Sequence, residues 1–250
     1  MPDRTFQRES PVTILQSAPD VTPQWMSRCM SSVEDWAARH HYHYRVRGDD
    51  LFDSIPQTLR SKLAGRMPVM ADLARLDWLS AVLSERGGVA VWIDADTVIL
   101  NRDWQIPFDT HSFFGEECWV QQDEKGCWRA YLSPHNAFMG FTAVSPVLPF
   151  LRYLSMSMIE RVDAAFIAPQ MIGPKLLKTL HNLADFVLVS EAGAVSPALL
   201  AEWVQGHGEA QACYERQNRS DLAMVNLCAS LSAEPGQMAL IETYLDREQV

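Results

Sequence analysis

Short apolar runs alternate with helical patterns in the N-terminal part of the chain. Residues 12–15 are apolar apart from one threonine and predict a short buried strand. Residues 42–46 alternate between apolar and polar side chains, as in a half-buried strand. Between these strands, Thr22 and Pro23 predict the start of a helix, because a hydroxyl can cap the first turn and proline lacks an N–H that this turn leaves unpaired.

A second helix and a third strand follow. The helix is predicted over residues 68–85, where one face carries four leucines, Leu73, Leu76, Leu79 and Leu83. The glycines Gly87 and Gly88 predict its end. Residues 89–93 are continuously apolar, which is typical of a strand buried on both faces. The order strand, helix, strand, helix, strand predicts an α/β sheet that is at least partly parallel.

The second part of the chain carries weaker patterns. We expect a strand over residues 137–143, a helix over residues 149–161, a helix that begins at Gly173-Pro174, and a strand over residues 186–189. No repeat and no linker rich in Gly, Ser or Pro divides the sequence. A single domain over residues 1–250 is therefore predicted.

Composition and charge narrow the class of protein. Lys and Arg number 21 against 31 Asp and Glu, a net charge of −10, which argues against a nucleic-acid binder held by a general basic field. No apolar run approaches the roughly 20 residues of a membrane span, and the first residues lack the apolar core of a signal peptide. The five cysteines form no Cys-x-x-Cys pair. A cytoplasmic protein with reduced thiols is the expectation.

Two carboxylates, Asp94 and Asp96, follow the most apolar predicted strand. Ligands of open α/β sheets bind beyond the carboxyl ends of the strands, so both are candidate binding residues. Charged side chains at the end of a buried strand must be solvated, paired or bound to a metal. Carboxylates suit Mg²⁺ or Mn²⁺, and such a metal keeps positions open for phosphate oxygens. A solvated turn is the alternative for this motif taken alone.

Asp72 and Arg75 precede this motif and share one face of the predicted helix. The string Ala-Asp-x-x-Arg-x-x-x-Leu that contains them, the glycine pair, the apolar strand and the Asp-x-Asp motif together resemble the sugar-binding region of DXD-motif glycosyltransferases. That group is typified by initiation-specific mannosyltransferases and capsular polysaccharide glycosyltransferases. The catalytic domains of the glucosylating toxins carry a distantly similar pattern. The resemblance covers residues 12–140 and is weaker beyond them.

The resemblance implies a GT-A-type nucleotide-diphospho-sugar transferase fold, with a mixed, mostly parallel sheet flanked by helices. It also implies a UDP- or GDP-hexose donor and Mn²⁺ or Mg²⁺ as cofactor. Residues 11–140 would form the nucleotide-sugar-binding half, and residues 141–250 the acceptor side and the C-terminal part of the metal site. The expected reaction moves a hexose to a hydroxyl of a glycan, lipid-linked or protein acceptor, with retention of configuration, as in polysaccharide biosynthesis.

The resemblance also assigns roles to the four candidate catalytic residues. Asp72 and Arg75 would contact the donor, which suits a carboxylate that accepts from sugar hydroxyls and a guanidinium that offers a planar fork to oxygen atoms. Asp94 would contact the ribose and the sugar and lie at the metal. Asp96 would bind the metal. A surface ion pair is the alternative for Asp72 and Arg75 considered without the downstream motif.

Further substrate contacts are expected outside this motif. Gln16 and Ser17 end the first predicted strand, where such folds receive the nucleotide base. His135 and Asn136 precede an apolar strand and would face the sugar or the acceptor, although a turn with a capping Asn is the equal alternative. Ser230 belongs to a C-terminal segment that resembles the last part of the family's binding site, and it is a candidate substrate contact.

The third metal ligand departs from the family pattern. Many relatives use a histidine near the C-terminus, and Asn226 stands at its place here. An Asn carbonyl is also a hard oxygen ligand, so the substitution is chemically acceptable. His207 is the competing candidate.

Two other functions remain open from the sequence. Asp94-Ala95-Asp96-Thr97-Val98 also satisfies the nucleophile motif of haloacid-dehalogenase-like phosphatases, in which Asp94 would be the nucleophile and Asp96 the acid/base. That motif normally opens its domain, whereas about ninety residues precede it here. The second alternative is a non-catalytic sugar-nucleotide-binding module, because the C-terminal histidine is missing.

Overall fold

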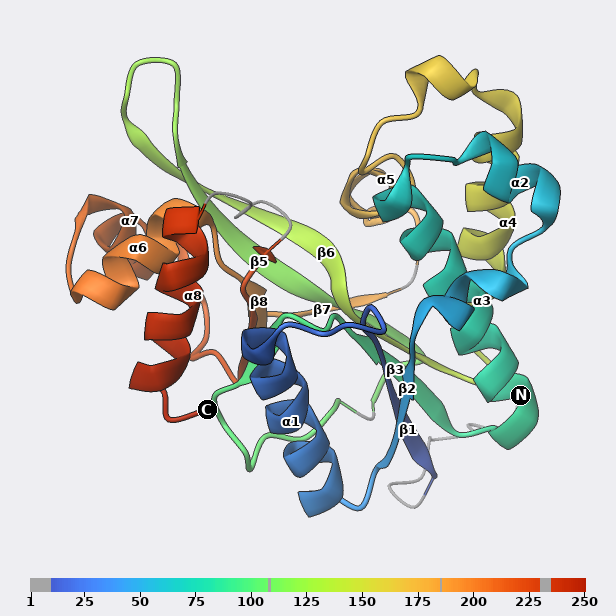
Figure 1. Cartoon of the computed structure of the whole chain (residues 1–250), viewed down its shortest axis with the longest axis horizontal. Helices are drawn as coiled ribbons and strands as arrows, with labels where there is room; N and C mark the ends of the chain where they lie inside the picture. The colour runs from blue at the N-terminus through green and yellow to red at the C-terminus, as the bar shows by residue number, and fades with distance from the viewer. Residues whose placement is uncertain (1–9, 108, 185, 230–234) are drawn as a thin grey trace.

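The computed structural model describes residues 10–107, 109–184, 186–229 and 235–250 (Figure 1). Its strands are β1 Val12–Ser17, β2 His43–Arg47, β3 Val89–Ile93, β4 Thr97–Ile99, β5 Ser112–Gln122, β6 Trp128–Thr142, β7 Val187–Val189, β8 Ala192–Ala194 and β9 Met224–Asn226. Its α-helices are α1 Gln24–Arg39, α2 Gln57–Lys62, α3 Met67–Arg86, α4 Val147–Arg161, α5 Pro174–Leu180, α6 Pro197–Gln205, α7 Glu209–Gln217 and α8 Pro235–Arg247. Two 3₁₀ turns cover Asp49–Ser54 and Ala164–Phe166.

The central sheet has six strands in the order β2-β1-β3-β6-β5-β7. Strand β6 is antiparallel to both of its neighbours, and the other strands of this sheet all point the same way. This topology confirms the predicted fold class, a mixed and mostly parallel α/β sheet flanked by helices. The first three strands and the helices α1 and α3 between them lie within two residues of their predicted positions.

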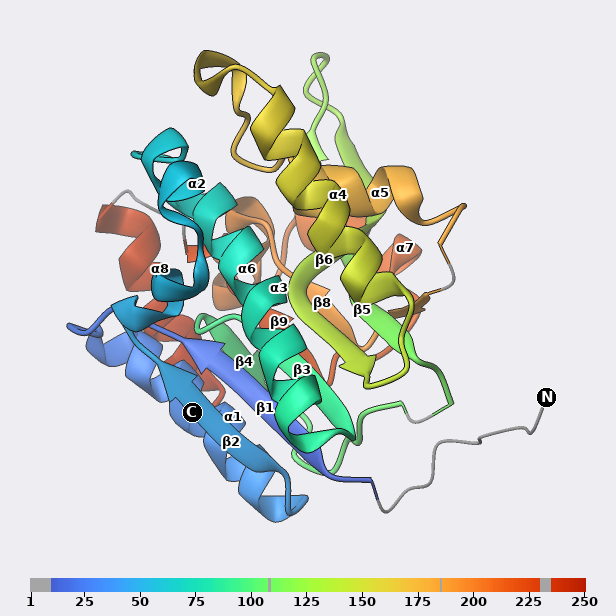
Figure 2. The same ribbon diagram turned by 90° about the vertical axis from the view of Figure 1, so that its right-hand side faces the viewer.

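Helices cover both faces of this sheet. The sequence of β3 accounts for this, because its side chains are apolar on both faces. Every residue of β3 is buried. Ala90 and Trp92 belong to the apolar cluster under α3 and α4, whereas Val91 and Ile93 belong to the cluster under α1. Figure 2 shows α3 and α4 crossing one face of the sheet. A continuous apolar run is what a strand needs when both of its faces are covered.

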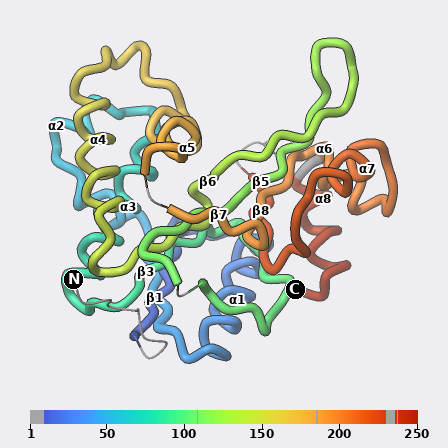
Figure 3. The backbone as a smooth tube through the Cα atoms, turned by 180° about the vertical axis from the view of Figure 1, so that it is seen from behind, coloured from blue at the N-terminus to red at the C-terminus, as the bar shows by residue number. Residues whose placement is uncertain are grey.

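The C-terminal helices gather around a second sheet with the strand order β4-β9-β8. Their apolar side chains form a third cluster, which includes Trp25 and Cys29 of α1. Figure 3 shows α6, α7 and α8 on one side of the molecule and α2, α4 and α5 on the other. The pairing of β4 with β9 brings Asn226 opposite Thr97, directly after the Asp-x-Asp motif. The sequence pattern predicted neither these helices nor this sheet.

Strands β5 and β6 form a long antiparallel hairpin that projects from the body of the molecule (Figures 1 and 3). The sequence predicted only residues 137–143 as a strand, which is too short. Burial explains the difference, because residues 128–133 of β6 are exposed or half-buried whereas the last six are all buried. The outer part of the hairpin therefore lacks the apolar pattern that identifies a strand.

The ends of two predicted helices can be compared with the structure. Pro23 directly precedes α1, and the Thr22 hydroxyl donates to the Pro19 carbonyl at 2.8 Å instead of capping the helix, so the predicted cap is wrong. Helix α3 ends at Gly87 with a φ of +66°, as the glycine pair predicted. Within the described ranges, no helix combines the length and the apolar character that crossing a bilayer requires.

Gly88 holds the start of β3 against the start of β1. Its φ is +69°, and an added Cβ would overlap the carbonyl oxygen of Pro11, which accepts the Val89 N–H at 2.9 Å. We predict that Gly88→Ala lowers the free energy of unfolding by more than about 2 kcal/mol, because left-handed strain adds to a displaced strand pair. Gly87→Ala is the matched control, since Gly87 has a similar φ but open space around its Cβ position. Equal losses for both variants in urea unfolding would contradict this account.

Candidate functional site

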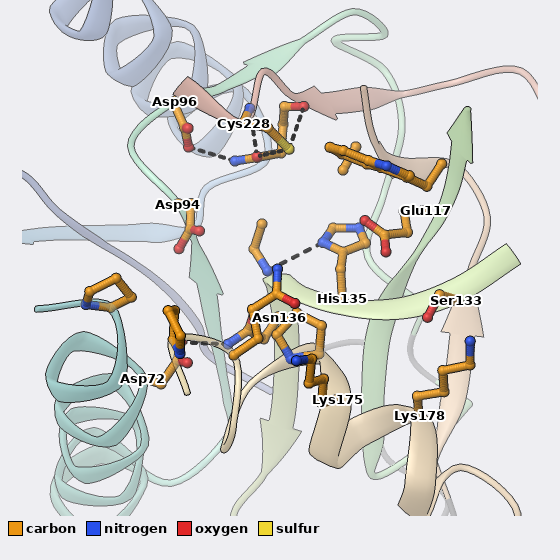
Figure 4. A pocket seen from close by; sticks show the side chains of 18 of the residues that line it. Asp72, Asp94, Asp96, Glu117, Ser133, His135, Asn136, Lys175, Lys178 and Cys228 are labelled. Carbon is orange, nitrogen blue, oxygen red and sulfur yellow. Dashed lines mark hydrogen bonds between the residues drawn. The ribbon is translucent and has the colours of Figure 1, made fainter. Parts of the chain in front are cut away.

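A cavity of about 520 Å³ lies beyond the carboxyl end of β3 (Figure 4). Its walls come from α3 and α5, from the loop after β3, from the β5–β6 hairpin and from the ends of β8 and β9. The structure brings most of the predicted site residues to this one cavity: Asp72, Arg75, Asp94, Asp96, His135, Asn136 and Asn226. They come from both predicted halves of the chain.

Arg75 organises one side of the cavity. Its guanidinium nitrogens lie 3.1 Å from Asp94 Oδ1 and 3.4 Å from Asp72 Oδ1, and one of them donates to the Asn136 carbonyl oxygen at 3.0 Å. The guanidinium also lies over the Trp92 ring, 4.9 Å from its centroid. Asp72 and Arg75 are both buried, so their interaction is not that of an exposed surface pair. The spacing of three residues on α3 therefore forms a buried ion pair, as part of a larger cluster.

An irregularity in β6 places Asn136 beside this cluster. The pairing of β5 with β6 shifts register between Phe114 and Gly115, where β6 carries extra residues. The Asn136 side-chain nitrogen donates to Asp72 Oδ1 at 2.7 Å. Asn136 thus contacts the cluster through its side chain and its backbone oxygen. The sequence offered a turn with a capping Asn as the equal alternative, and this geometry favours the site assignment.

His135 occupies the same irregularity but has no free ring nitrogen. Its Nε2–H donates to the Ala192 carbonyl oxygen at 2.8 Å, and its Nδ1 accepts the Ala137 N–H at 3.2 Å. Burial lowers the pKa of His135, which keeps the ring neutral and consistent with this pattern of donors and acceptors. His135 therefore shapes the cavity wall and links β6 to β8.

Asp96 lies at the opposite side of the cavity from Asp72 (Figure 4). Its two carboxylate oxygens accept hydrogen bonds from Asn226 Nδ2 at 2.5 Å and from the Ala229 N–H at 2.9 Å. Burial and the negative charge of Asp94 raise the pKa of Asp96. Among the described residues, no Lys, Arg or His forms an ion pair with Asp96. A half-buried carboxylate without a cationic partner is a suitable ligand for a divalent ion.

The candidate metal ligands in the cavity are few. Within the described part of the chain, no group of three or more His, Cys, Asp or Glu residues could hold an ion. Asn226 is close to Asp96, but its amide nitrogen faces the carboxylate while its oxygen accepts the Cys228 N–H at 3.0 Å. His207 is exposed between α6 and α7 and does not line the cavity. A hard cation here would rest on Asp94 and Asp96 and complete its shell with water or substrate oxygens.

Gln16 lies beneath the site rather than in it. Its side chain is fully buried, donates to the Asp94 carbonyl oxygen at 3.2 Å and accepts from the Tyr44 hydroxyl at 2.6 Å. These contacts fix the backbone of the Asp-x-Asp motif. Ser17 is half-buried and does not line the cavity. Ser230 lies outside the described residues.

Burial disfavours the ionised form of Asp72. Burial raises the pKa of Asp72 to about 6, although the Arg75 charge and the Asn136 hydrogen bond oppose the shift. Gly173, just before α5, comes so close that an added Cβ would lie 2.7 Å from Asp72 Oδ2. Asp72 is therefore confined between α5, Arg75 and Asn136, with the cavity as its remaining open side.

Other residues of the cavity were missed by sequence reasoning. Strand β5 contributes Glu117, Trp119 and Gln121, which share one face of the strand, and α5 contributes Lys175 and Lys178. Burial raises the pKa of Glu117 to about 7, and the charge of Lys178 opposes the shift. One signal was available in the sequence, since a carboxylate inside a run of apolar and aromatic residues needs an explanation.

The burial of Glu117 can be tested through the pH dependence of stability. Its folded-state pKa is raised, so its contribution to stability is fully present below about pH 4.5 and is lost as the pH rises through about 7. We predict that wild-type protein loses up to about 3 kcal/mol relative to Glu117→Gln over this range, because only the wild type must bury an ionised carboxylate. Urea unfolding at a series of pH values measures the difference.

Glu116→Gln is the control for this experiment. Glu116 precedes Glu117 on β5, pairs with Arg219 at 3.7 Å and does not line the cavity. We expect this variant to keep the wild-type pH profile. Parallel profiles for wild type and Glu117→Gln would refute the burial of an ionisable carboxylate at this position.

The comparisons with known proteins concern the fold. No protein-family model and no curated protein sequence matches the chain. The structure is similar to the "crystal structure of a glycosyltransferase involved in the glycosylation of the major capsid of PBCV-1", with a TM-score of 0.50 and 11% sequence identity. The match covers 96% of this chain and 100% of that one. At this identity it shows the fold alone, and that fold agrees with the GT-A-type fold predicted from the sequence.

Proposed function

We propose that the chain is a metal-dependent glycosyltransferase that moves a hexose from a UDP- or GDP-hexose to a hydroxyl of a glycan, lipid-linked or protein acceptor, with retention. One observation carries the proposal: the Asp72–Arg75 pair and the Asp94–Asp96 pair line the same cavity beyond β3. The glycosyltransferase with a similar fold supports the same class of reaction. The donor, the metal and the stereochemistry come from the sequence resemblance.

The Asp72 side of the cavity suits the sugar of the donor. Asp72 offers carboxylate oxygens to sugar hydroxyls, and the Asn136 amide and the Arg75 guanidinium already orient it. These groups are fixed by burial and by mutual hydrogen bonds before any ligand arrives. A preorganised polar set of this kind positions a reacting carbon without reorganisation during the reaction.

The Asp96 side suits the nucleoside diphosphate. Asp94 and Asp96 would hold Mn²⁺ or Mg²⁺, which when bound supplies Lewis-acid stabilisation to the departing diphosphate. The protein contributes the orientation of both carboxylates: Asn226 and the Ala229 N–H fix Asp96, and Trp92 Nε1 donates to Asp94 Oδ1 at 2.5 Å. In the transfer itself, the acceptor oxygen forms a bond to the anomeric carbon on the face that the diphosphate leaves, the bond from that carbon to the diphosphate oxygen breaks, and the proton of the acceptor hydroxyl passes to the departing diphosphate.

The position of the motif in the chain disfavours the phosphatase alternative, because that motif normally opens its domain and about ninety residues precede it here. At Asp94, Oδ1 interacts with the Arg75 guanidinium and the Trp92 indole, so a nucleophilic aspartate would have to attack phosphorus through Oδ2. The observation that favours a binding module without turnover is Asn226 in place of the C-terminal histidine, and assays of turnover separate such a module from an enzyme.

We predict that Asp96→Ala lowers the Mn²⁺-dependent hydrolysis or transfer of UDP- and GDP-hexoses to less than about one hundredth of the wild-type rate. The reason is the loss of the carboxylate expected to hold the metal. Released nucleoside diphosphate measures the rate, and a thermal-shift titration with Mn²⁺ and each nucleotide sugar measures binding.

Asp103→Ala is the matched control for Asp96→Ala. Asp103 is exposed, forms a surface ion pair with Arg39 and lies outside the cavity. It should retain the wild-type rate. Wild-type turnover by Asp96→Ala would overturn the proposed function, and phosphate release from a simple phosphomonoester by the wild type would favour the phosphatase.

We predict that Arg75→Lys reduces kcat/KM for the nucleotide sugar about a hundredfold. A lysine ammonium cannot reach Asp72, Asp94 and the Asn136 carbonyl at once, because it lacks the planar fork of the guanidinium. Arg45→Lys is the control, since Arg45 forms an exposed pair with Glu85. An unchanged kcat/KM in Arg75→Lys would show that Arg75 is only a structural ion-pair residue.

A further inference from the structure

The cavity has an outer part away from Asp72, Asp94 and Asp96. In Figure 4, His135 and Asn136 lie between Asp94 on one side and Ser133 and Lys178 on the other. This outer part is built by the face of the β5–β6 hairpin that carries Glu117 and Ser133, which are directly opposite in register, and by α5, which packs on β6.

The side chains of this outer part are suited to a sugar. Glu117, Trp119 and Gln121 alternate along β5 and therefore project from the same face, and all three line the cavity. The Trp119 Nε1–H donates to Gln121 Oε1 at 3.2 Å, which holds the indole in one orientation. An aromatic ring offers its face to the C–H groups of a pyranose, while amide and hydroxyl groups bind its hydroxyls.

Two lysines line this cavity in addition to Glu117. They are Lys175 and Lys178 of α5, two of the four lysines among the 21 basic residues of the chain. Both are exposed, and neither forms an ion pair or a side-chain hydrogen bond with another described residue. Lys178 acts electrostatically on Glu117, whereas the cation that acts on Asp72 is Arg75. Lys178 therefore belongs to the outer part, and Lys175 lies below Asn136, between the outer part and Asp72 (Figure 4).

We propose that the outer part of the cavity is an acceptor subsite for a sugar that carries a negatively charged group, with Trp119 against the ring and Lys175 and Lys178 on the anion. This assignment rests on the proposed function, because it gives the acceptor the part of the cavity that the donor leaves open. A uronate carboxylate and a phosphate ester share the chemistry that two unpaired ammonium groups recognise. The subsite therefore selects anionic glycans over neutral ones.

The test measures binding of three probes by ligand-observed NMR in the presence of the diamagnetic ion Mg²⁺ and nucleoside diphosphate. The probes are a methyl hexoside, the corresponding methyl hexuronide and the phosphate monoester of the methyl hexoside. We expect the wild type to bind the charged probes about tenfold more tightly than the neutral one. The charged probe that binds more tightly identifies the preferred anion, either a carboxylate or a phosphate ester. Equal affinity for all three, or no binding of any, would overturn the subsite.

Variants separate charge recognition from ring recognition. Lys175→Gln with Lys178→Gln should abolish the preference for charged probes while the affinity for the methyl hexoside stays unchanged. Trp119→Leu should weaken the binding of all three probes. Lys125→Gln removes the same charge from the exposed tip of the hairpin, outside the cavity, and should keep the wild-type preference. A preference that survives in the double lysine variant rejects the role of both lysines.

A separate measurement distinguishes this inference from the proposed function. Mn²⁺-dependent hydrolysis of UDP- and GDP-hexoses by the wild type tests the donor side alone. Hydrolysis without any charge preference would reject the acceptor subsite and leave the glycosyltransferase proposal standing. A charge preference without hydrolysis would keep an anionic-sugar site and reject the transferase.

Discussion

The site depends on one buried cation, the Arg75 guanidinium. It lies within 3.4 Å of carboxylate oxygens of both Asp72 and Asp94, which come from a helix and from the loop after a strand. The Arg75 charge stabilises the ionised form of the buried Asp72, because an unpaired buried charge is costly. The same guanidinium also donates to the backbone of the β6 irregularity. A single side chain of helix α3 thus contacts both the loop after β3 and strand β6.

Arg75 pairs with Asp72 and Asp94 but not with Asp96, so the two sides of the cavity differ in charge. Asp96 receives hydrogen bonds from Asn226 and Ala229 but has no cationic partner among the described residues. Burial, and then the negative charge of Asp94, raise the pKa of Asp96. A divalent ion would supply the missing cationic partner, which is why an acidic protein can bind a diphosphate through a metal. The negative charge that excludes a general nucleic-acid binder is compatible with a nucleotide donor.

The reversed strand β6 explains how the proposed donor and acceptor sides come to share one cavity. A strand antiparallel to β3 returns its N-terminal half past the carboxyl end of β3, where ligands of such sheets bind. The irregularity at Asn136 closes the donor side, and the projecting hairpin with Trp119 extends the wall outward. Helix α5 covers the remaining side and brings Lys175 and Lys178 to it.

The sequence by itself determined the first strands and helices, the end of α3 at Gly87 and the carboxylates after β3, because local periodicity and turn chemistry encode these features. It also indicated that Asp72 and Arg75 share a helical face. Only the tertiary structure decided that Asn226 bonds Asp96 through its nitrogen, that Gln16 supports the site from below and that Glu117 lines it. Those facts depend on strand order, register and a β6 irregularity. They are set by pairings between residues far apart in the chain, which no local pattern records.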